Sequence, residues 1–359
     1  MGDFEYSNMI KATPQMQDYP PKNVHPPGPH VIIIGNGFDK FIGRPTTYAE
    51  FYESDYCPKN YPAPLIQYLN GISGDGKAAK FRWYDFENEL LKYSTDLNFH
   101  EDPLSSIEKQ VLKKIIKSGF YLNGKQPTEQ IMNEVQAQNS LVNKHLLERD
   151  QFGVLSYVFG EFYDNIVERD KEAFSLIKEG LVAYLNSVSQ VQLKPEIEQK
   201  IKVRLGDFGE THRIVYTFNY TQFPSIGTNE IHYVHGSCQN NDIVLGTREE
   251  KAIEKDYWFV QKLFDTNYRP AYVLADLFNA DRVTIFGHSL GENDRQYFEA
   301  FFKRQCNPEK AKKDLPITIY TKDQEAVMEI KHSLQELTDY HLSDLLQNSK
   351  LDIVTTDSI

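Results

Sequence analysis

The stretch VIIIGNGFD, residues 31–39, decides the fold, because a run of β-branched apolar residues stops at two glycines that flank one asparagine. Such a run is typical of a strand buried on both faces, as in a parallel sheet covered by helices. Glycine lets the backbone turn sharply and approach a ligand, and successive N–H groups in such a turn can bind an anion. The stretch predicts a buried strand and a phosphate-binding turn; the alternative is a tight turn without a ligand.

Two better-known glycine motifs are not matched. The dinucleotide fingerprint requires a third glycine, and Lys40 stands at that position. The triphosphate-binding loop requires serine or threonine after Gly-Lys, and Gln126 follows Gly124-Lys125. The sequence therefore disfavours both a hydride-transferring dehydrogenase and a phosphate-loop ATPase.

Length and composition are those of a globular chain. Its 359 residues allow about two domains, or one large α/β domain that carries an insertion. No apolar run approaches the roughly 18 residues that a membrane span needs, and residues 1–10 lack a signal-peptide pattern. The cysteines are odd in number and widely spaced, which indicates a reducing compartment: Cys57, Cys238 and Cys306. We therefore expect a cytoplasmic protein without a membrane segment.

The net charge of −12 weighs against general binding to nucleic acid, because such binding needs a clustered basic surface. No such cluster stands in the sequence. An anionic ligand would then depend on backbone dipoles and a few cations. The candidate cations are Lys40, Arg44, Arg248 and Arg295. These residues are equally well explained as ordinary surface charges.

The chain divides into three parts by pattern. Residues 1–30 are rich in proline and predict an extended or disordered leader. Residues 62–205 predict a helical insertion, because they show helical periods at 86–93, 107–116 and 155–166 and almost no strand-like alternation. The remaining segments, 31–61 and 206–359, are expected to form one α/β nucleotide-binding domain.

Strand signals recur after the insertion and alternate with helical segments. Strands are predicted at 213–218, 231–235, 243–245, 282–286, 317–320 and, weakly, 351–354. Helices are predicted near 252–265, 292–304 and 323–347. This alternation predicts an α/β fold with a mostly parallel sheet and helices on both faces.

Polar residues follow four of the predicted strands. They are Asn36, Asn219, His235 and Ser289. In α/β sheets, ligands bind at the carboxyl ends of the strands, where loops converge. Each residue alone is equally a turn residue or a buried histidine, but four such positions together favour a ligand site.

Six short motifs together resemble the bacteriophage abortive-infection AbiH family. They are GNGFD at 35–39, PTTY at 45–48 with Phe51, WYDFE at 83–87, FNYT at 218–221, HG at 235–236, and GHSLG at 287–291 with Asp294. Lys40 and Arg44 stand where apolar residues are more usual in that family. The resemblance implies an antiphage role, and leaves open a homo-oligomer or a co-encoded partner.

A fainter resemblance is to sirtuin-like NAD-binding domains, in which a Gly-x-Gly turn opens the fold and an asparagine and a histidine act at the nicotinamide ribose. Asn219 and His235 match that pair in order and type. The resemblance implies a sirtuin-like, Rossmann-type fold with NAD or a related nucleotide as substrate or ligand. Asp39 stands where sirtuins have a serine, and the Cys-x-x-Cys pairs of their zinc module are absent. We therefore expect cleavage of NAD rather than protein deacylation, and no metal.

The implied reaction is hydrolysis of the N-glycosidic bond of NAD, which releases nicotinamide. It requires stabilisation of an oxocarbenium-like transition state and a placed water. A neutral histidine can accept a proton at neutral pH, and an asparagine amide can hold the ribose or the water. We therefore expect Asn219 and His235 to be catalytic. The residues expected to bind the nucleotide are Gly35, Asn36, Gly37, Asp39, Thr46, Ser289 and Asp294.

Two alternatives stay open at this point. Residues 287–291 fit the Gly-x-Ser-x-Gly nucleophile elbow, which predicts a serine hydrolase or esterase that uses Ser289. Its acid and base would be Asp314 with His332 or His341. The second alternative is a nucleotide-sensing module that binds NAD or a derivative without turnover.

Overall fold

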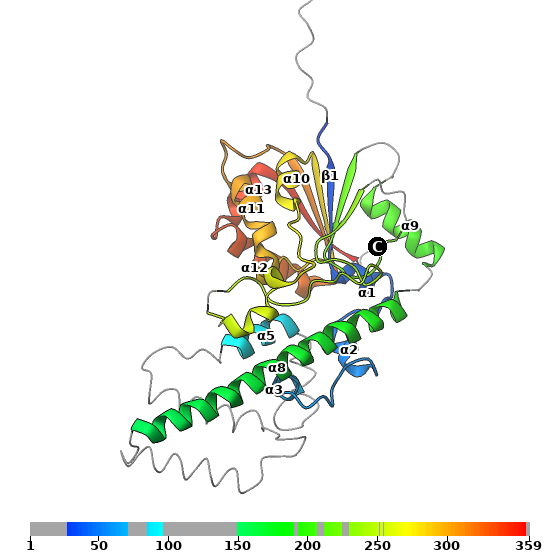
Figure 1. The fold of residues 1–359 in the computed structure, drawn as a ribbon. Helices are drawn as coiled ribbons and strands as arrows, with labels where there is room; N and C mark the ends of the chain where they lie inside the picture. The colour runs from blue at the N-terminus through cyan, green and yellow to red at the C-terminus, as the bar shows by residue number, and fades with distance from the viewer. Residues whose placement is uncertain are drawn as a thin grey trace, which may run out of the picture.

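A computed structural model describes residues 27–70, 85–95, 149–189, 193–206, 212–224, 230–250, 252–253 and 255–356. Figure 1 shows a central sheet with helices on both sides and the long helix α8 (Arg149–Val188) across one end of the sheet.

The sheet has six strands, and every pair of neighbours is parallel. The strands are β1 (His30–Ile34), β2 (Arg213–Thr217), β3 (Glu230–Tyr233), β4 (Arg282–Phe286), β5 (Leu315–Thr321) and β6 (Ser349–Thr355). Their order is β3-β2-β1-β4-β5-β6, so the direction of winding reverses between β1 and β4. This is the doubly wound order in which ligands bind outside the carboxyl ends of the strands at the reversal. The α/β prediction is confirmed.

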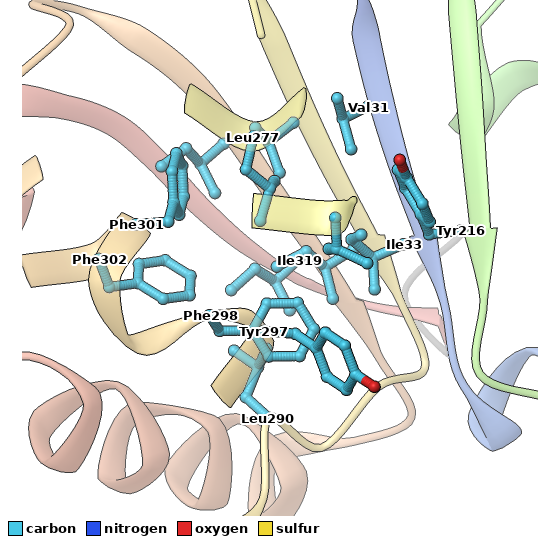
Figure 2. Close-up of a cluster of buried hydrophobic side chains, with 14 of the residues drawn as sticks. Val31, Ile33, Tyr216, Leu277, Leu290, Tyr297, Phe298, Phe301, Phe302 and Ile319 are labelled. Carbon is cyan, nitrogen blue, oxygen red and sulfur yellow. The ribbon is translucent and has the colours of Figure 1, made fainter. Parts of the chain in front are cut away.

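Helices cover both faces of the sheet, as predicted. Successive side chains of a strand point to opposite faces, and in β1 all of them are buried. Val31 and Ile33 belong to the apolar cluster of Figure 2, with α10 (Val273–Asn279), α11 (Glu299–Cys306), α12 (Gln324–Leu337) and α13 (Leu342–Asn348). Ile32 and Ile34 pack on the other face against α1 (Asn36–Phe41) and α9 (Pro195–Leu205).

The described helices between α1 and α9 lie at the end of the sheet where α1 begins, which is the carboxyl end of β1 (Figure 1). They are α2 (Tyr48–Glu53), α3 (Pro64–Asn70), α5 (Phe86–Thr95) and α8. Their apolar cluster also contains Leu245 and Tyr257, so its core is shared with residues that follow β3. The helical segment therefore covers the edge of the sheet at which a ligand would bind. The division at residues 62 and 205 stays a prediction.

Four sequence-based element predictions need correction. Residues 243–245 are not a strand, although Ile243 and Leu245 are buried, because the Val244 N–H donates to the His235 carbonyl in a loop. The segment 252–265 contains two short 3₁₀ helices, η1 (Lys255–Val260) and η2 (Lys262–Phe264). The segment 292–304 begins as the 3₁₀ helix η3 (Glu292–Tyr297) before α11, and 323–347 is divided between α12 and α13.

Some of the sequence-based predictions concern residues that the structure does not describe, and others fall within described helices. The proline-rich leader before residue 27 and the helical period at 107–116 are outside them. The period at 86–93 falls in α5, and the period at 155–166 falls within α8. In the described part of the chain, none of the helices has the length and apolar character needed to cross a lipid bilayer.

Candidate functional site

The parallel topology brings the polar residues that follow four strands to one edge of the sheet. Ile34 of β1 is paired with Thr217 of β2 and with Phe286 of β4, and Thr217 is paired with Tyr233 of β3. Asn36, Asn219, His235 and Ser289 follow these strand ends within three residues or fewer. Asn36 and Ser289, on the two sides of the reversal between β1 and β4, are exposed.

The glycines of the first turn hold two loops together. The Gly37 N–H donates to the Gly287 carbonyl at 2.9 Å, and the Phe38 N–H donates to the Gly35 carbonyl at 2.9 Å. A Cβ atom on Gly37 would lie 2.7 Å from the Gly287 Cα, and one on Gly35 would lie 2.6 Å from the His288 Cα. These glycines therefore permit contact between the β1 and β4 loops, and two of the turn's N–H groups are occupied within the protein.

Three further predicted residues support the same turn. The Asn219 Nδ2 donates to the Gly35 carbonyl at 3.1 Å, and the Thr46 hydroxyl donates to the Asn36 Oδ1 at 2.6 Å. Asp39 is 2% exposed. Its carboxylate accepts a 2.5 Å hydrogen bond from Thr221 and pairs with Arg44 at 3.4 Å. Burial raises the pKa of Asp39 despite these partners. A direct contact between Asp39 and a nucleotide would require this buried arrangement to open.

A buried group of charged and imidazole side chains lies beside these loops; we call it the His235 network, and it consists of Glu87, His235, Lys262, His288 and Asp294. Asp294 stands between the two imidazoles. Its Oδ1 lies 3.0 Å from the His235 Nε2, and its Oδ2 lies 3.4 Å from the His288 Nε2. The His288 Nδ1 accepts the Leu290 N–H at 2.9 Å, which leaves the His288 Nε2 to donate to Asp294.

Lys262 supplies the cation of the network. Its Nζ lies 3.1 Å from the Glu87 Oε2, 3.8 Å from the Asp294 Oδ1 and 3.5 Å from the His235 Nε2. Lys262 and His235 are 5% and 4% exposed, whereas the Asp294 side chain is 20% exposed. The network therefore reaches the surface at Asp294.

The charges of the network fix its protonation. Burial, followed by the positive charge of Lys262, lowers the pKa of His235 below its ordinary value. Burial alone would raise the pKa of Asp294, but Lys262 and hydrogen bonds from both histidines hold it well below its usual range. At neutral pH the pair is therefore a neutral imidazole against an ionised carboxylate.

One nitrogen of His235 is left available for chemistry. A carboxylate only accepts hydrogen bonds, so the Nε2 that faces Asp294 carries the proton and the Nδ1 is an acceptor. This buried Nδ1 has no hydrogen-bond partner within the described part of the chain, and neither has the Tyr297 hydroxyl. The Phe218 ring packs edge-on against His235, with ring centroids 5.5 Å apart. The arrangement is that of a general base oriented by a carboxylate.

Within the His235 network, the structure joins two of the predicted site residues, His235 and Asp294, although Asp294 was expected to bind the nucleotide. Asn219 is 8% exposed and bonds to Gly35 instead of His235. Sequence reasoning noted Glu87 without a role and missed Lys262 and His288 as members of the site. A signal for Lys262 exists, because it is a single cation between the apolar residues Val260 and Phe264.

The serine hydrolase arrangement is not formed. Ser289 follows β4 at the carboxyl edge, whereas Asp314 precedes β5 at the amino edge of the same parallel sheet. A five-residue strand spans about 17 Å, too far for a hydrogen-bonded triad. The candidate bases are also solvent-facing, since the side chains of His332 and His341 are 68% and 65% exposed.

Among the residues that the structure describes, no group of three or more His, Cys, Asp or Glu side chains is arranged to hold a metal ion. The expectation that the protein uses no metal stays a prediction.

Comparison with known proteins gives one match. The model of a family described as "Bacteriophage abortive infection AbiH" matches residues 31–312. No curated protein and no solved structure matches the chain. The matched range contains the whole His235 network and both glycine loops.

Proposed function

Because the chain belongs to the bacteriophage abortive infection AbiH family, we propose that it acts in antiphage defence by hydrolysing the N-glycosidic bond of NAD or a related nucleotide. A water oxygen forms a bond to C1′ of the ribose as the bond from C1′ to nicotinamide breaks. The bonding electron pair leaves with nicotinamide, and the His235 Nδ1 takes the proton of the water. The products are nicotinamide, ADP-ribose and a proton.

The observation that carries this proposal is the His235–Asp294 pair with its unpartnered Nδ1. A general base must be neutral at working pH and must offer a lone pair to the reacting group. Burial and Lys262 keep the pKa of His235 low enough for the first condition. The orientation by Asp294 meets the second, as a carboxylate does for the histidine of a catalytic triad.

The surroundings of the pair favour a nucleotide as the substrate. The doubly wound strand order is one in which nucleotides bind at the reversal, here between β1 and β4. Asn36 and Ser289 are exposed on the two sides of that reversal and can take polar groups of the nucleotide. The water or ribose hydroxyl must reach the buried His235 Nδ1, which is the ring nitrogen that does not face Asp294.

The test mixes purified full-length protein with NAD and measures free nicotinamide by chromatography. We expect release by the wild type and a loss of about 10²- to 10⁴-fold in rate for His235→Ala, because the base is removed. The matched control is His232→Ala, which removes a half-exposed imidazole from β3, three residues before His235. Near-normal release by a folded His235→Ala variant would sink the assignment.

The alternative function, a nucleotide sensor, would use the same site. It is distinguished from a glycohydrolase by measuring NAD binding alongside nicotinamide release. If NAD binds with a measurable heat but no nicotinamide forms, the protein is a sensor rather than a glycohydrolase. Asn219→Ala belongs in the same series: as a catalytic residue it should reduce turnover, and its bond to Gly35 indicates that the reduction acts through the first turn.

A further inference from the structure

Lys262 is buried, where a charged lysine destabilises the fold unless carboxylates pair with it. The residue is 5% exposed, and removing an ammonium group from water is strongly unfavourable without paired carboxylates. Two carboxylates meet this need: Glu87 at 3.1 Å and Asp294 at 3.8 Å. The same two contacts place the ammonium 3.5 Å from the His235 Nε2.

We propose that Lys262 is a positioning residue that keeps the His235 imidazole neutral and oriented on Asp294, and that Glu87 holds Lys262 in place from helix α5. This inference rests on the proposed role of His235 as the base, and it adds the residues that set the state of that base.

The charges that face His235 come from three elements. Asp294 of η3 favours the imidazolium form and Lys262 of η2 opposes it, as does His288 of the loop after β4 when it is protonated. Burial is the largest factor that lowers the pKa of His235, and the charge of Lys262 is the next. Without Lys262, the Asp294 carboxylate would favour an imidazolium whose Nδ1 already carries a proton. Such an imidazolium cannot accept a proton from water. The aromatic rings that contact His235, those of Phe218 and Tyr297, bring no charge at neutral pH.

Glu87 is the residue through which the helical segment contacts Lys262, the cation beside His235. It lies on α5, and its Oε1 accepts a hydrogen bond from the Tyr48 hydroxyl of α2 at 3.3 Å. Burial alone would lower the pKa of Lys262, but Glu87 and Asp294 raise it, so the lysine stays charged. A displacement of α5 from η2 would withdraw Glu87 from Lys262. The helical segment can therefore alter the protonation of His235 through one ion pair.

The test reads the His235 imidazole directly by NMR, in full-length protein with labelled histidine. The chain has 10 histidines, so the His235 signal is assigned by its loss in His235→Gln. In the wild type we expect a neutral ring with the proton on Nε2 and no titration near neutral pH. In Lys262→Met we expect the His235 pKa to rise by about 1 to 3 units, because a cation within hydrogen-bonding range has been removed. The acid limb of the NAD cleavage profile should move upward by the same amount.

A second variant guards against misfolding. Lys262→Met alone leaves Glu87 buried without its cation, so the double variant Lys262→Met/Glu87→Gln removes both charges. It should show the same rise in the His235 pKa. Glu87→Gln alone keeps a side-chain oxygen that can accept a hydrogen bond from Lys262, so the lysine stays beside His235 and that pKa should not rise. Lys171→Met, which removes an exposed cation on α8, is the matched control and should leave the titration unchanged.

An unchanged His235 titration in the folded double variant would overturn the proposal. The imidazole measurement needs no turnover, so its outcome is separate from that of the nicotinamide assay. If the wild type releases no nicotinamide but the His235 pKa rises as expected, the electrostatic role of Lys262 stands and the proposed reaction fails.

Discussion

At the scale of single residues, glycines allow the backbones of two loops to meet at the carboxyl edge. Gly287 has a φ of +67°, and a Cβ there would lie 2.3 Å from the Phe38 nitrogen. The sequence correctly marked the glycines as special, because residues without side chains permit close backbone approach. It could not say what approaches them, since a loop from a distant part of the chain and a bound phosphate make the same demand.

Substitution of Gly37 separates these two roles. In Gly37→Ala the new Cβ would lie 2.7 Å from the Gly287 Cα, so we expect a loss of about 1 to 3 kcal/mol in the free energy of unfolding. The measurement is denaturant unfolding. The control is Gly43→Asn: Gly43 has a φ of +84° with no atom within 4 Å, and asparagine tolerates that conformation. Unchanged stability in Gly37→Ala, with weakened NAD binding, would instead support a phosphate-binding turn.

The His235 network shows where residue-level prediction stops. His235 and Asp294 were both found from the polar ends of strands and the family motifs, but with different roles. Lys262 was missed because a single cation among apolar residues is a weak signal, and a 3₁₀ helix has no amphipathic period long enough to strengthen it. Its importance follows from carboxylates contributed by α5 and η3, which lie far from it in the sequence.

At the scale of elements, strands were predicted well where they are buried on both faces. β4 was predicted with its observed bounds, because a run of apolar residues in a central strand is distinctive. The same pattern failed at 243–245, where the apolar residues belong to the cluster of the helical segment. Three buried residues in a loop and three in a strand give the same sequence signal.

The helices of that segment are tied together by Asp170 of α8. Its carboxylate accepts hydrogen bonds from the Leu65 N–H at 2.8 Å, the Tyr93 hydroxyl at 2.6 Å and the Tyr257 hydroxyl at 2.9 Å. These donors come from α3, α5 and η1. Burial outweighs the hydrogen bonds and raises the pKa of Asp170 to about 6.

This raised pKa predicts a pH dependence of stability with a definite sign. Between pH 3.8 and about pH 6 the unfolded chain loses the Asp170 proton while the folded chain keeps it, so the free energy of unfolding falls as pH rises. The total change is about 3 kcal/mol, and it is complete above the folded-state pKa.

Asp170→Asn isolates this contribution, because the amide keeps a hydrogen-bonding group without a titration. The stability of the variant relative to the wild type should increase from pH 4 to pH 6 and then stay constant, as measured by denaturant unfolding at each pH. A relative stability that is flat across this window would show that Asp170 titrates normally in the folded protein.

At the scale of the whole molecule, the sheet is assembled from strands on both sides of the helical segment. The central place of β1 agrees with its fully buried side chains, and the edge position of β3 agrees with its partly exposed ones. The remaining order could not be predicted, because pairing of β1 with β4 depends on contacts between loops far apart in the chain. The position of α5 and α8 over the carboxyl edge could not be predicted from the sequence either. This position brings Glu87 to the site.

The last prediction concerns cells under phage attack. An enzyme that cleaves NAD consumes many substrate molecules, so infected cells that carry the wild-type chain should lose NAD before the phage is released. Cells with His235→Ala should keep their NAD and lose protection, whereas cells with His232→Ala should behave as the wild type. NAD and phage yield are measured in the same cultures, with expression of each variant checked. Protection at constant NAD would show that the substrate is wrong, even though the chain belongs to the abortive-infection family.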